Sequence, residues 1–282
     1  ISRVHGSRDY FQIKQGSFLF EIIPILNIKD PKKAMNITDI SPLHASFVKK
    51  HSKLADEIRL LKQFCKANNC YGAESYIGGF SGYACEVLII YYGSFMKLAR
   101  RAARWKPKVI IDYKKYYKRK NPLDELNTSK LQSPIVMIDP VQKTRNVTAA
   151  LSEEKFNLFK KICQKFLKKP SKEFFREKEF SLEKIKNKAK GKNLILIDVK
   201  ALPGKKDVVG SKLAKAFKWI IKKTEENDFK IISSGWEWDE KKQVLFWIMT
   251  KKEPLSGYKE IPGPKSKVPE KFKKDFRKKH KN

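Results

Sequence analysis

The chain has 282 residues, of which 41% are hydrophobic, so it can form about two domains with cores of their own and is not an intrinsically disordered protein. It carries 63 Lys and Arg against 30 Asp and Glu, a formal net charge of +33. This excess favours a polyanionic partner such as a nucleic acid, although solvated lysine-rich faces would give the same composition. We expect no membrane partner, because Glu86 interrupts the longest apolar run and the first residues do not read as a signal peptide.

The four cysteines lie within apolar helical patterns, which is typical of reduced core thiols in a cytoplasmic protein. They are Cys65, Cys70, Cys85 and Cys163. Together with the nearby histidines they match no common zinc-finger spacing, so we do not expect a zinc site.

Residues 17–26 are rich in β-branched and aromatic residues and are predicted to form a strand. Alternation places Glu21 on the same face as Leu19 and Ile23. A carboxylate among apolar neighbours is costly unless it is paired, which indicates a metal or a basic partner. The alternative is an edge-strand glutamate that faces water.

Residues 29–42 are interpreted as a loop, with Ser41-Pro42 as a turn signal. Residues 51–68 follow as an amphipathic helix with Leu54, Ile58, Leu61 and Cys65 on one stripe. Lys62 lies beside this stripe, where a lysine is either a surface residue with a buried stem or a ligand.

Glycines surround a serine in residues 78–82, directly before a second helix that is predicted to run to about Trp105. Ser81 can cap this helix, and free N–H groups at its start would suit a phosphate. Gly78 and Gly79 are therefore either a structural turn or a phosphate or RNA contact. Arg100, Arg101 and Arg104 suit the negative end of the helix dipole and would equally form a phosphate patch beside Trp105.

Short strands are predicted at residues 107–113 and 134–140, separated by a polar loop at 113–134. Ser152, followed by two glutamates, signals a helix start, and Pro170 signals its end. Farther along, a strand (193–199), a helix (210–226) and two strands (229–235 and 243–250) indicate a small α+β sandwich. The last eighteen residues are strongly basic, and Phe272 and Phe276 lie one helical turn apart, so the segment is either a docking helix or a frayed end.

Several segments together resemble the archaeal CCA-adding enzymes, tRNA nucleotidyltransferases of the DNA polymerase β-like superfamily. The order and spacing of the segments make the resemblance specific over about residues 8–176. In chain order they are Phe-Glu-Ile-Ile-Pro (20–24), Ser-Pro-Leu-His (41–44), Glu-Ile-Arg-Leu-Leu-Lys-Gln-Phe (57–64), Tyr-Gly-Ala-Glu (71–74), Gly-Gly-Phe-Ser-Gly-Tyr-Ala-Cys-Glu-Val-Leu (78–88), Tyr-Gly-Ser-Phe (92–95), Arg-Trp-Lys-Pro (104–107) and Asp-Pro-Val-Gln-Lys-Thr-Arg-Asn-Val (139–147).

The resemblance implies an α+β protein with the remnant of a nucleotidyltransferase sheet, a helical neck and a small α/β sandwich body. Residues 1–50 correspond to the C-terminal part of the head and residues 51–177 to the neck, the substrate-binding domain. Residues 178–264 correspond to the body, and residues 265–282 form a basic C-terminal segment. The N-terminal half of the head, and the distal tail, are expected to be missing.

The resemblance also implies the activity, which is addition of CCA to the 3′ end of tRNA from CTP and ATP with two Mg²⁺ ions. Glu21 matches a metal-binding carboxylate, although the family usually has Asp there. His44, Lys62, Tyr71 and Arg145 match positions that contact the incoming nucleotide: the first three suit the phosphates, and Arg145 helps to read the base. Gly78, Gly79, Ser81, Arg100, Arg101 and Arg104 are the expected RNA contacts.

The remaining metal carboxylates have no counterpart upstream of Glu21, because Gly6-Ser7 resembles a phosphate loop but no Asp-x-Asp follows. We therefore expect the chain to be inactive alone and to work with a separately encoded N-terminal half, or to be part of a longer enzyme. The alternatives are a non-catalytic tRNA-binding module and a related adenylyltransferase that acts on another RNA.

Overall fold

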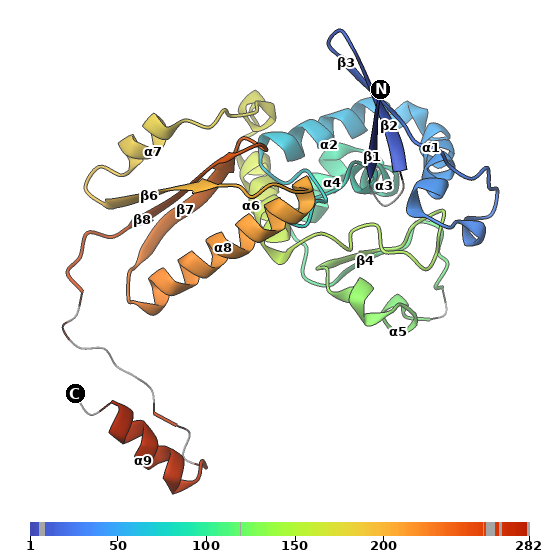
Figure 1. Cartoon of the computed structure of the whole chain (residues 1–282). Helices are drawn as coiled ribbons and strands as arrows, with labels where there is room; N and C mark the ends of the chain where they lie inside the picture. The colour runs from blue at the N-terminus through green and yellow to red at the C-terminus, as the bar shows by residue number, and fades with distance from the viewer. Residues whose placement is uncertain (6–8, 119, 256, 258–262, 265–266, 281–282) are drawn as a thin grey trace. The chain divides into compact units, whose positions relative to one another are not determined.

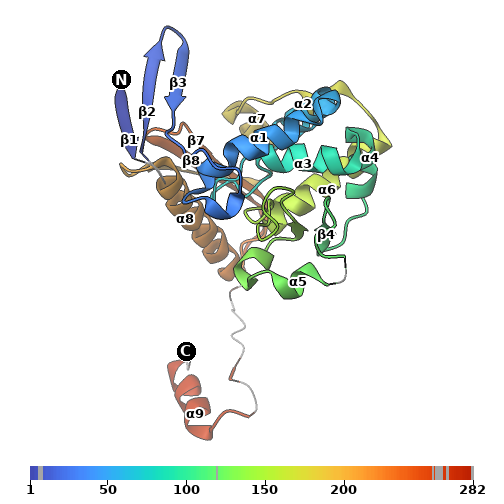
Figure 2. The same ribbon diagram turned by 90° about the vertical axis from the view of Figure 1, so that its right-hand side faces the viewer.

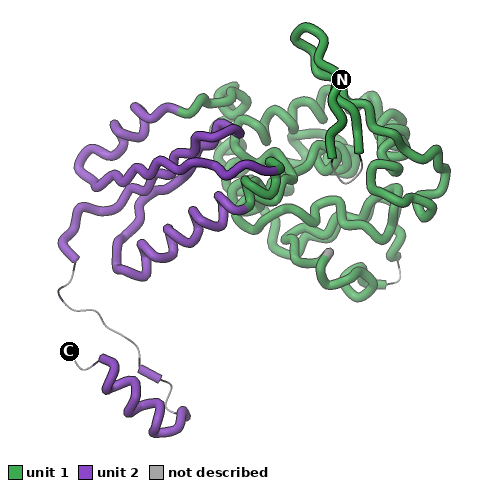
Figure 3. Tube along the Cα trace, in the orientation of Figure 1, with its two compact units in different colours: residues 1–180, 205–211 green, residues 181–204, 212–282 purple. Residues whose placement is uncertain are grey.

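The computed structural model describes residues 1–5, 9–118, 120–255, 257, 263–264 and 267–280, which divide into two compact units (Figure 3). Unit 1 comprises residues 1–180 and 205–211, and unit 2 comprises residues 181–204 and 212–282. Helices combined with small, mostly antiparallel sheets confirm the predicted α+β class. The finer domain boundaries stay predictions. Gly6-Ser7, interpreted as a loop from the sequence, lies outside the described residues.

The helices and strands within residues 1–180 follow one another in the order drawn in Figure 1. They are β1 (Ser2–His5), β2 (Asp9–Gln15), β3 (Phe18–Ile22), α1 (Ser41–Lys49), α2 (Ala55–Ala67), α3 (Gly82–Tyr92), α4 (Phe95–Ala102), β4 (Val109–Ile111), α5 (Pro122–Glu125), β5 (Ile135–Met137) and α6 (Glu153–Lys168).

The first three strands form an antiparallel sheet in the order β1-β2-β3. The predicted strand at 17–26 is β3, which stops at Ile22, two residues before a proline that cannot donate to a ladder. Phe18, Leu19, Phe20 and Ile22 are all exposed, so apolar side chains face solvent on both faces of this strand. Figures 1 and 2 both show the turn between β2 and β3 projecting away from the helices. We did not predict β1 and β2 from the sequence.

The core of unit 1 lies among α2, α3, α4 and α6. Ile58, Leu61 and Cys65 of the predicted α2 stripe are buried, as is Phe64 between them. Phe64 packs against rings from α4 and α6, including Phe95 with a centroid distance of 5.0 Å. The four cysteines are free and buried in this core, which confirms their interpretation as core thiols.

One predicted helix is two helices in the structure. Gly93 ends α3 in a left-handed conformation (φ +83°), and Ser94 caps α4 by accepting a hydrogen bond from Lys97 N. A glycine cap followed by a serine cap is a strong local break, which the apolar run on either side concealed. Trp105, at the predicted end of this helix, is buried, and its ring stacks on Phe156 with a centroid distance of 5.9 Å.

The segment interpreted as a loop before residue 42 leads into α1, which the sequence analysis missed. Pro42 lies in the first turn of α1, where proline is favoured because its missing N–H has no helical partner. The buried carboxylate of Asp39, just before the helix, accepts hydrogen bonds from Leu26 N, Met35 N and Asn36 N. It thereby holds the connection from β3 to α1.

Between residues 113 and 134 the predicted loop contains α5 and a short 3₁₀ turn. The flanking strands β4 and β5 pair in parallel, Val109 opposite Ile135, and β5 is buried throughout. Helix α6 starts as predicted, because Ser152 Oγ accepts from Lys155 N.

Unit 2 contains a second three-stranded antiparallel sheet and most of a long helix, in the predicted order strand, helix, strand, strand. The described elements from residue 181 onward are α7 (Leu182–Lys188), β6 (Asn193–Lys200), α8 (Lys206–Glu226), β7 (Ile231–Trp238), β8 (Gln243–Thr250) and α9 (Glu270–Lys279). The sheet order is β6-β8-β7, with Phe217 of α8 packed on Phe246 of the central strand at 5.2 Å. Phe272 and Phe276 lie on α9.

Candidate functional site

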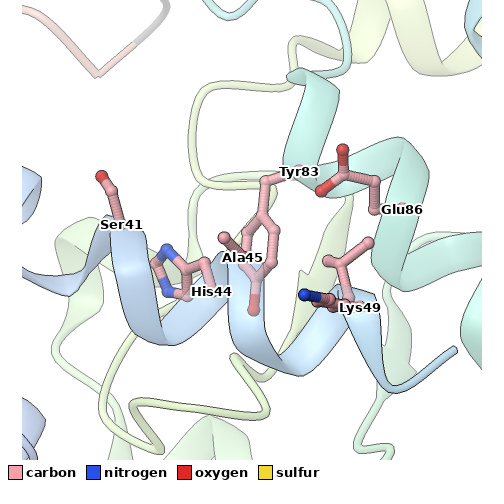
Figure 4. Close-up of a pocket in the computed structure, with 7 residues that line it drawn as sticks. Ser41, His44, Ala45, Lys49, Tyr83 and Glu86 are labelled. Carbon is pink, nitrogen blue, oxygen red and sulfur yellow. The ribbon is translucent and has the colours of Figure 1, made fainter. Parts of the chain in front are cut away.

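A hollow of about 520 Å³ opens between α1 and α3 in unit 1. Its walls combine an imidazole, a phenol ring, a carboxylate and an ammonium group with small apolar side chains. The lining residues are Ser41, His44, Ala45, Val48, Lys49, Tyr83 and Glu86. Figure 4 shows His44 and Lys49 reaching into it from α1, and Tyr83 and Glu86 from α3.

A buried carboxylate behind this hollow joins three distant segments. Asp139, just after β5, has a side chain that is 0% exposed. Its Oδ2 accepts from His44 Nε2 at 2.9 Å and from Arg145 Nη1 at 2.8 Å. Its Oδ1 accepts from Tyr83 OH at 3.1 Å and from Val141 N at 2.8 Å. The His44 ring also stacks on Tyr83 with a centroid distance of 4.1 Å.

The electrostatics of this cluster keep Asp139 ionised. Burial alone would raise the pKa of its carboxyl, but the hydrogen bond and attraction from His44, with the Val141 and Arg145 donors, outweigh burial and lower the pKa. Burial and the neighbouring carboxylate raise the pKa of Tyr83, so its hydroxyl stays protonated and donates to Asp139.

A second polar group continues the site along α3. Lys62 Nζ donates to Glu86 Oε1 at 2.6 Å. A Cβ built on Gly82, at the start of α3, would lie 3.0 Å from Tyr71 OH and 3.8 Å from Lys62 Nζ, so the phenol and the ammonium group both lie at this helix N-terminus. Burial raises the pKa of Tyr71, partly offset by Lys62.

The structure thus brings the four predicted nucleotide contacts into one neighbourhood. His44 and Arg145 share one oxygen of Asp139, while Lys62 reaches the hollow through Glu86, with Tyr71 beside it. That they contact a nucleotide stays a prediction. Asp139, Tyr83 and Glu86 are members of the site that the sequence analysis did not assign. Asp139 stands at the end of a predicted strand and Glu86 is a charge within an apolar run, and all three lie in segments that resemble the family.

The glycine turn is occupied by internal contacts. Gly78 N donates to Glu74 O, and Gly79 N donates to Gly72 O at 2.7 Å. A Cβ on Gly79 would lie 2.3 Å from the carbonyl oxygen of Cys70, so only glycine fits there. Ser81 Oγ caps α3 by accepting from Ala84 N at 3.0 Å. The structural interpretation of the turn accounts for these groups without a ligand, so their RNA contacts stay a prediction.

The three arginines at the end of α4 are exposed, which fits either predicted role. Arg100 and Arg101 lie in the last turn of α4, and Arg104 follows it. The contacts among the described residues do not distinguish a phosphate patch from a solvated helix end.

Glu21 lies exposed on β3, opposite Gln12 of β2, whose Nε2 donates to Glu21 Oε1 at 2.7 Å. The described residues therefore match the alternative of a water-facing glutamate on an outer strand. Within the described ranges, no three His, Cys, Asp or Glu side chains gather closely enough to hold a metal ion. Among the described residues, Glu21 is therefore not part of a complete metal site, and its role as a metal ligand stays a prediction.

Residues 56–176 match the family described as tRNA nucleotidyltransferase, second domain. The chain is 38% identical over 252 residues to the CCA-adding enzyme of Nanoarchaeum equitans, an alignment that covers 89% of this chain and 61% of the relative. The CCA-adding enzyme of Methanocaldococcus jannaschii is 33% identical over 249 residues, with 86% and 55% covered. That of Saccharolobus shibatae is 31% identical over 265 residues, with 92% and 60% covered.

The chain is a partial-length relative of these CCA-adding enzymes. This confirms the resemblance drawn from the sequence motifs. The matched part spans 55 to 61% of the length of these three relatives. Within the part of this chain that the structure describes, every helix is too short or too polar to cross a membrane.

Proposed function

We propose that this chain supplies the nucleotide- and tRNA-binding part of an enzyme that adds CCA to the 3′ end of tRNA from CTP and ATP. Its similarity to CCA-adding enzymes over 86 to 92% of its length is the observation that carries the proposal. His44 lines the hollow, and Lys62, Tyr71 and Arg145 lie just outside it, bonded to or beside residues of α3 and Asp139; this arrangement supports the proposal.

In this proposal the nucleotide occupies the hollow between α1 and α3, whose volume is typical of small-ligand sites. His44 and Lys62 bind triphosphate oxygens, and Tyr71 supplies a hydroxyl and a ring beside them. Arg145 reads the base, because a guanidinium presents several donors in a fixed plane and matches an edge of acceptors.

The tRNA acceptor end would be bound by cationic surface outside the hollow. The net charge of +33 and the exposed Arg100, Arg101 and Arg104 support this part of the proposal. Gly78, Gly79 and Ser81 would contribute through the shape of their turn, because the N–H groups of both glycines already donate within the chain. A cytoplasmic location is expected for such an RNA-processing protein.

Catalysis would use Mg²⁺, with Glu21 as one carboxylate ligand and the others supplied by protein outside the described residues. We therefore expect this chain by itself to bind substrates without joining them. The added protein would be a further part of a longer enzyme or a separately encoded N-terminal half.

A second candidate is a non-catalytic tRNA-binding module or the subunit of a split enzyme. The exposed apolar side chains on both faces of β3 favour a subunit, because such faces are normally covered by protein. Phe18 is 69% exposed and Leu19 is 59% exposed. A related adenylyltransferase acting on another RNA is a third candidate.

The test measures binding and incorporation separately with the 282-residue chain. Titrations with CTP, ATP and tRNA lacking its CCA end should each saturate, while labelled CMP and AMP should not enter tRNA. Robust incorporation would overturn the expected inactivity, and absence of CTP and ATP binding would overturn the nucleotide site. Saturation by tRNA alone would support the non-catalytic module. Comparing binding and incorporation on tRNA ending in CC with those on other RNAs distinguishes a CCA-adding enzyme from an adenylyltransferase that acts on another RNA.

A further inference from the structure

Asp139 is the acceptor on which two polar side chains of the hollow, His44 and Tyr83, converge. Its four hydrogen bonds come from α1, from α3, and from two donors in the loop after β5. His44 is separated from Asp139 by 95 residues in the sequence, and Tyr83 by 56. The cluster therefore depends on the tertiary fold and cannot form from any one segment.

The residues bonded to Asp139 reach from the interior to the surface of the site. Asp139 itself is fully buried, whereas the His44 side chain is 13% exposed and that of Arg145 is 31% exposed. His44 also lines the hollow. Each of these two side chains thus has one end fixed by the buried carboxylate and a remaining surface that a ligand can reach.

The chemistry of the cluster requires a carboxylate. All four partners donate, and an ionised aspartate is acceptor-only on both oxygens. An asparagine of the same shape would turn an NH₂ group toward two of these donors, whichever way its amide faced. A buried donor that faces another donor destabilises the fold, because its hydrogen bond is lost and its desolvation is not compensated.

We propose that Asp139 is the positioning residue of the nucleotide site, holding the His44 imidazole and the Arg145 guanidinium in place before a nucleotide binds. The inference rests on the proposed function for the identity of the ligand. It assigns Asp139 no contact with the nucleotide. Fixing two side chains in advance lowers the entropy that binding would otherwise cost.

The first experiment titrates CTP and ATP into the 282-residue wild type and the Asp139→Asn and Tyr83→Phe variants. Asp139→Asn should weaken both affinities by about tenfold or more, because it disturbs hydrogen bonds to two charged or ionisable side chains. Tyr83→Phe removes one neutral donor and should weaken them by only about threefold. Circular dichroism and thermal unfolding establish that each variant is folded. A folded Asp139→Asn chain with wild-type affinities would overturn the proposal.

The second experiment needs no variant and follows the His44 and Arg145 side-chain nitrogens by NMR in the nucleotide-free wild type. A held guanidinium should give separate, slowly exchanging Nη signals, and the His44 Nε2 proton should be protected from solvent. Averaged Arg145 signals together with a rapidly exchanging His44 proton would overturn the proposal even if Asp139→Asn fails to fold. If the wild type binds neither nucleotide, the proposed function fails, while these spectra still decide whether Asp139 holds the two side chains.

Discussion

The Lys62 ammonium group lies 2.6 Å from the Glu86 carboxylate, and this pair joins α2 to α3 at the wall of the hollow. Both side chains are about three-quarters buried, with 28% and 22% exposure. A triphosphate that binds Lys62 must therefore compete with a carboxylate that already holds it. Glu86 opposes the ligand twice, by occupying the lysine and by repelling the phosphates.

Glu86→Gln should therefore tighten CTP binding by about threefold, because it removes one negative charge from the wall while keeping its shape. Isothermal titration at low and moderate salt measures the change. Asp56→Asn is the matched control, since it removes an ion-paired but exposed carboxylate from α2. Weaker binding by Glu86→Gln would mean that the carboxylate supports the ligand.

Lys62→Met should lower the affinity for CTP and ATP by about tenfold, because the proposed charge-assisted contact to phosphate would be lost while the aliphatic stem is kept. Lys161→Met, at an exposed position on α6, is the control and should bind like the wild type. Equal losses in both variants would attribute the effect to net charge alone.

Replacing Arg100, Arg101 and Arg104 together by Gln should reduce the slope of log affinity for tRNA against log salt by about 2 to 3, if each contacts one phosphate. CTP binding should not change. The control replaces Lys184, Lys186 and Lys188 of α7, which are also exposed. If the control lowers the slope equally, the arginines form no dedicated RNA patch.

Gly79→Ala should destabilise unit 1 by about 3 kcal/mol, because its Cβ would meet backbone atoms of Cys70 and Gly72 that cannot move aside cheaply. Gly16→Ala provides the comparison, since Gly16 has a positive φ but no atom within 4 Å of the added Cβ. The free energy of unfolding of the Gly16→Ala control should fall by only about 1 kcal/mol, because an alanine is strained in the left-handed backbone conformation. Urea unfolding of both variants tests the difference, and equal losses would show that the turn tolerates a side chain.

Acid should remove the stabilisation that Asp139 provides. Burial opposes ionisation, but His44 and the other donors lower the folded-state pKa below the unfolded value near 4. The contribution is therefore complete above the unfolded pKa and is lost as the pH falls through the folded pKa. The difference in unfolding free energy between wild type and Asp139→Asn should shrink as the pH falls from about 7 to about 3. A constant difference across this range would contradict the linkage.

Local signals in the sequence were enough for the elements with clear caps. Ser152 marked the start of α6, and the apolar stripe marked the face of α2. The same local reasoning missed α1, because a serine followed by proline signals either a turn or a first helical turn. The tertiary contacts of the segment decide between a turn and a first helical turn.

The candidate site was predictable only through the resemblance. It pointed to His44, Lys62, Tyr71 and Arg145, which carry positive charge or hydrogen-bonding groups. Asp139 and Glu86 were visible as a strand end and as a charge in an apolar run, but their roles depend on partners 95 and 24 residues away. No periodicity or spacing encodes such a pairing.

The buried Asp39 carboxylate connects the N-terminal sheet to α1, the helix whose His44 lines the hollow. Because Asp39 fixes Leu26, four residues after β3, and lies two residues before α1, the segment between them is tied at both ends. A movement of the β1-β2-β3 sheet would therefore be transmitted to α1, the helix that carries His44. A protein that packs on that sheet would thereby change the position of the His44 imidazole in the hollow.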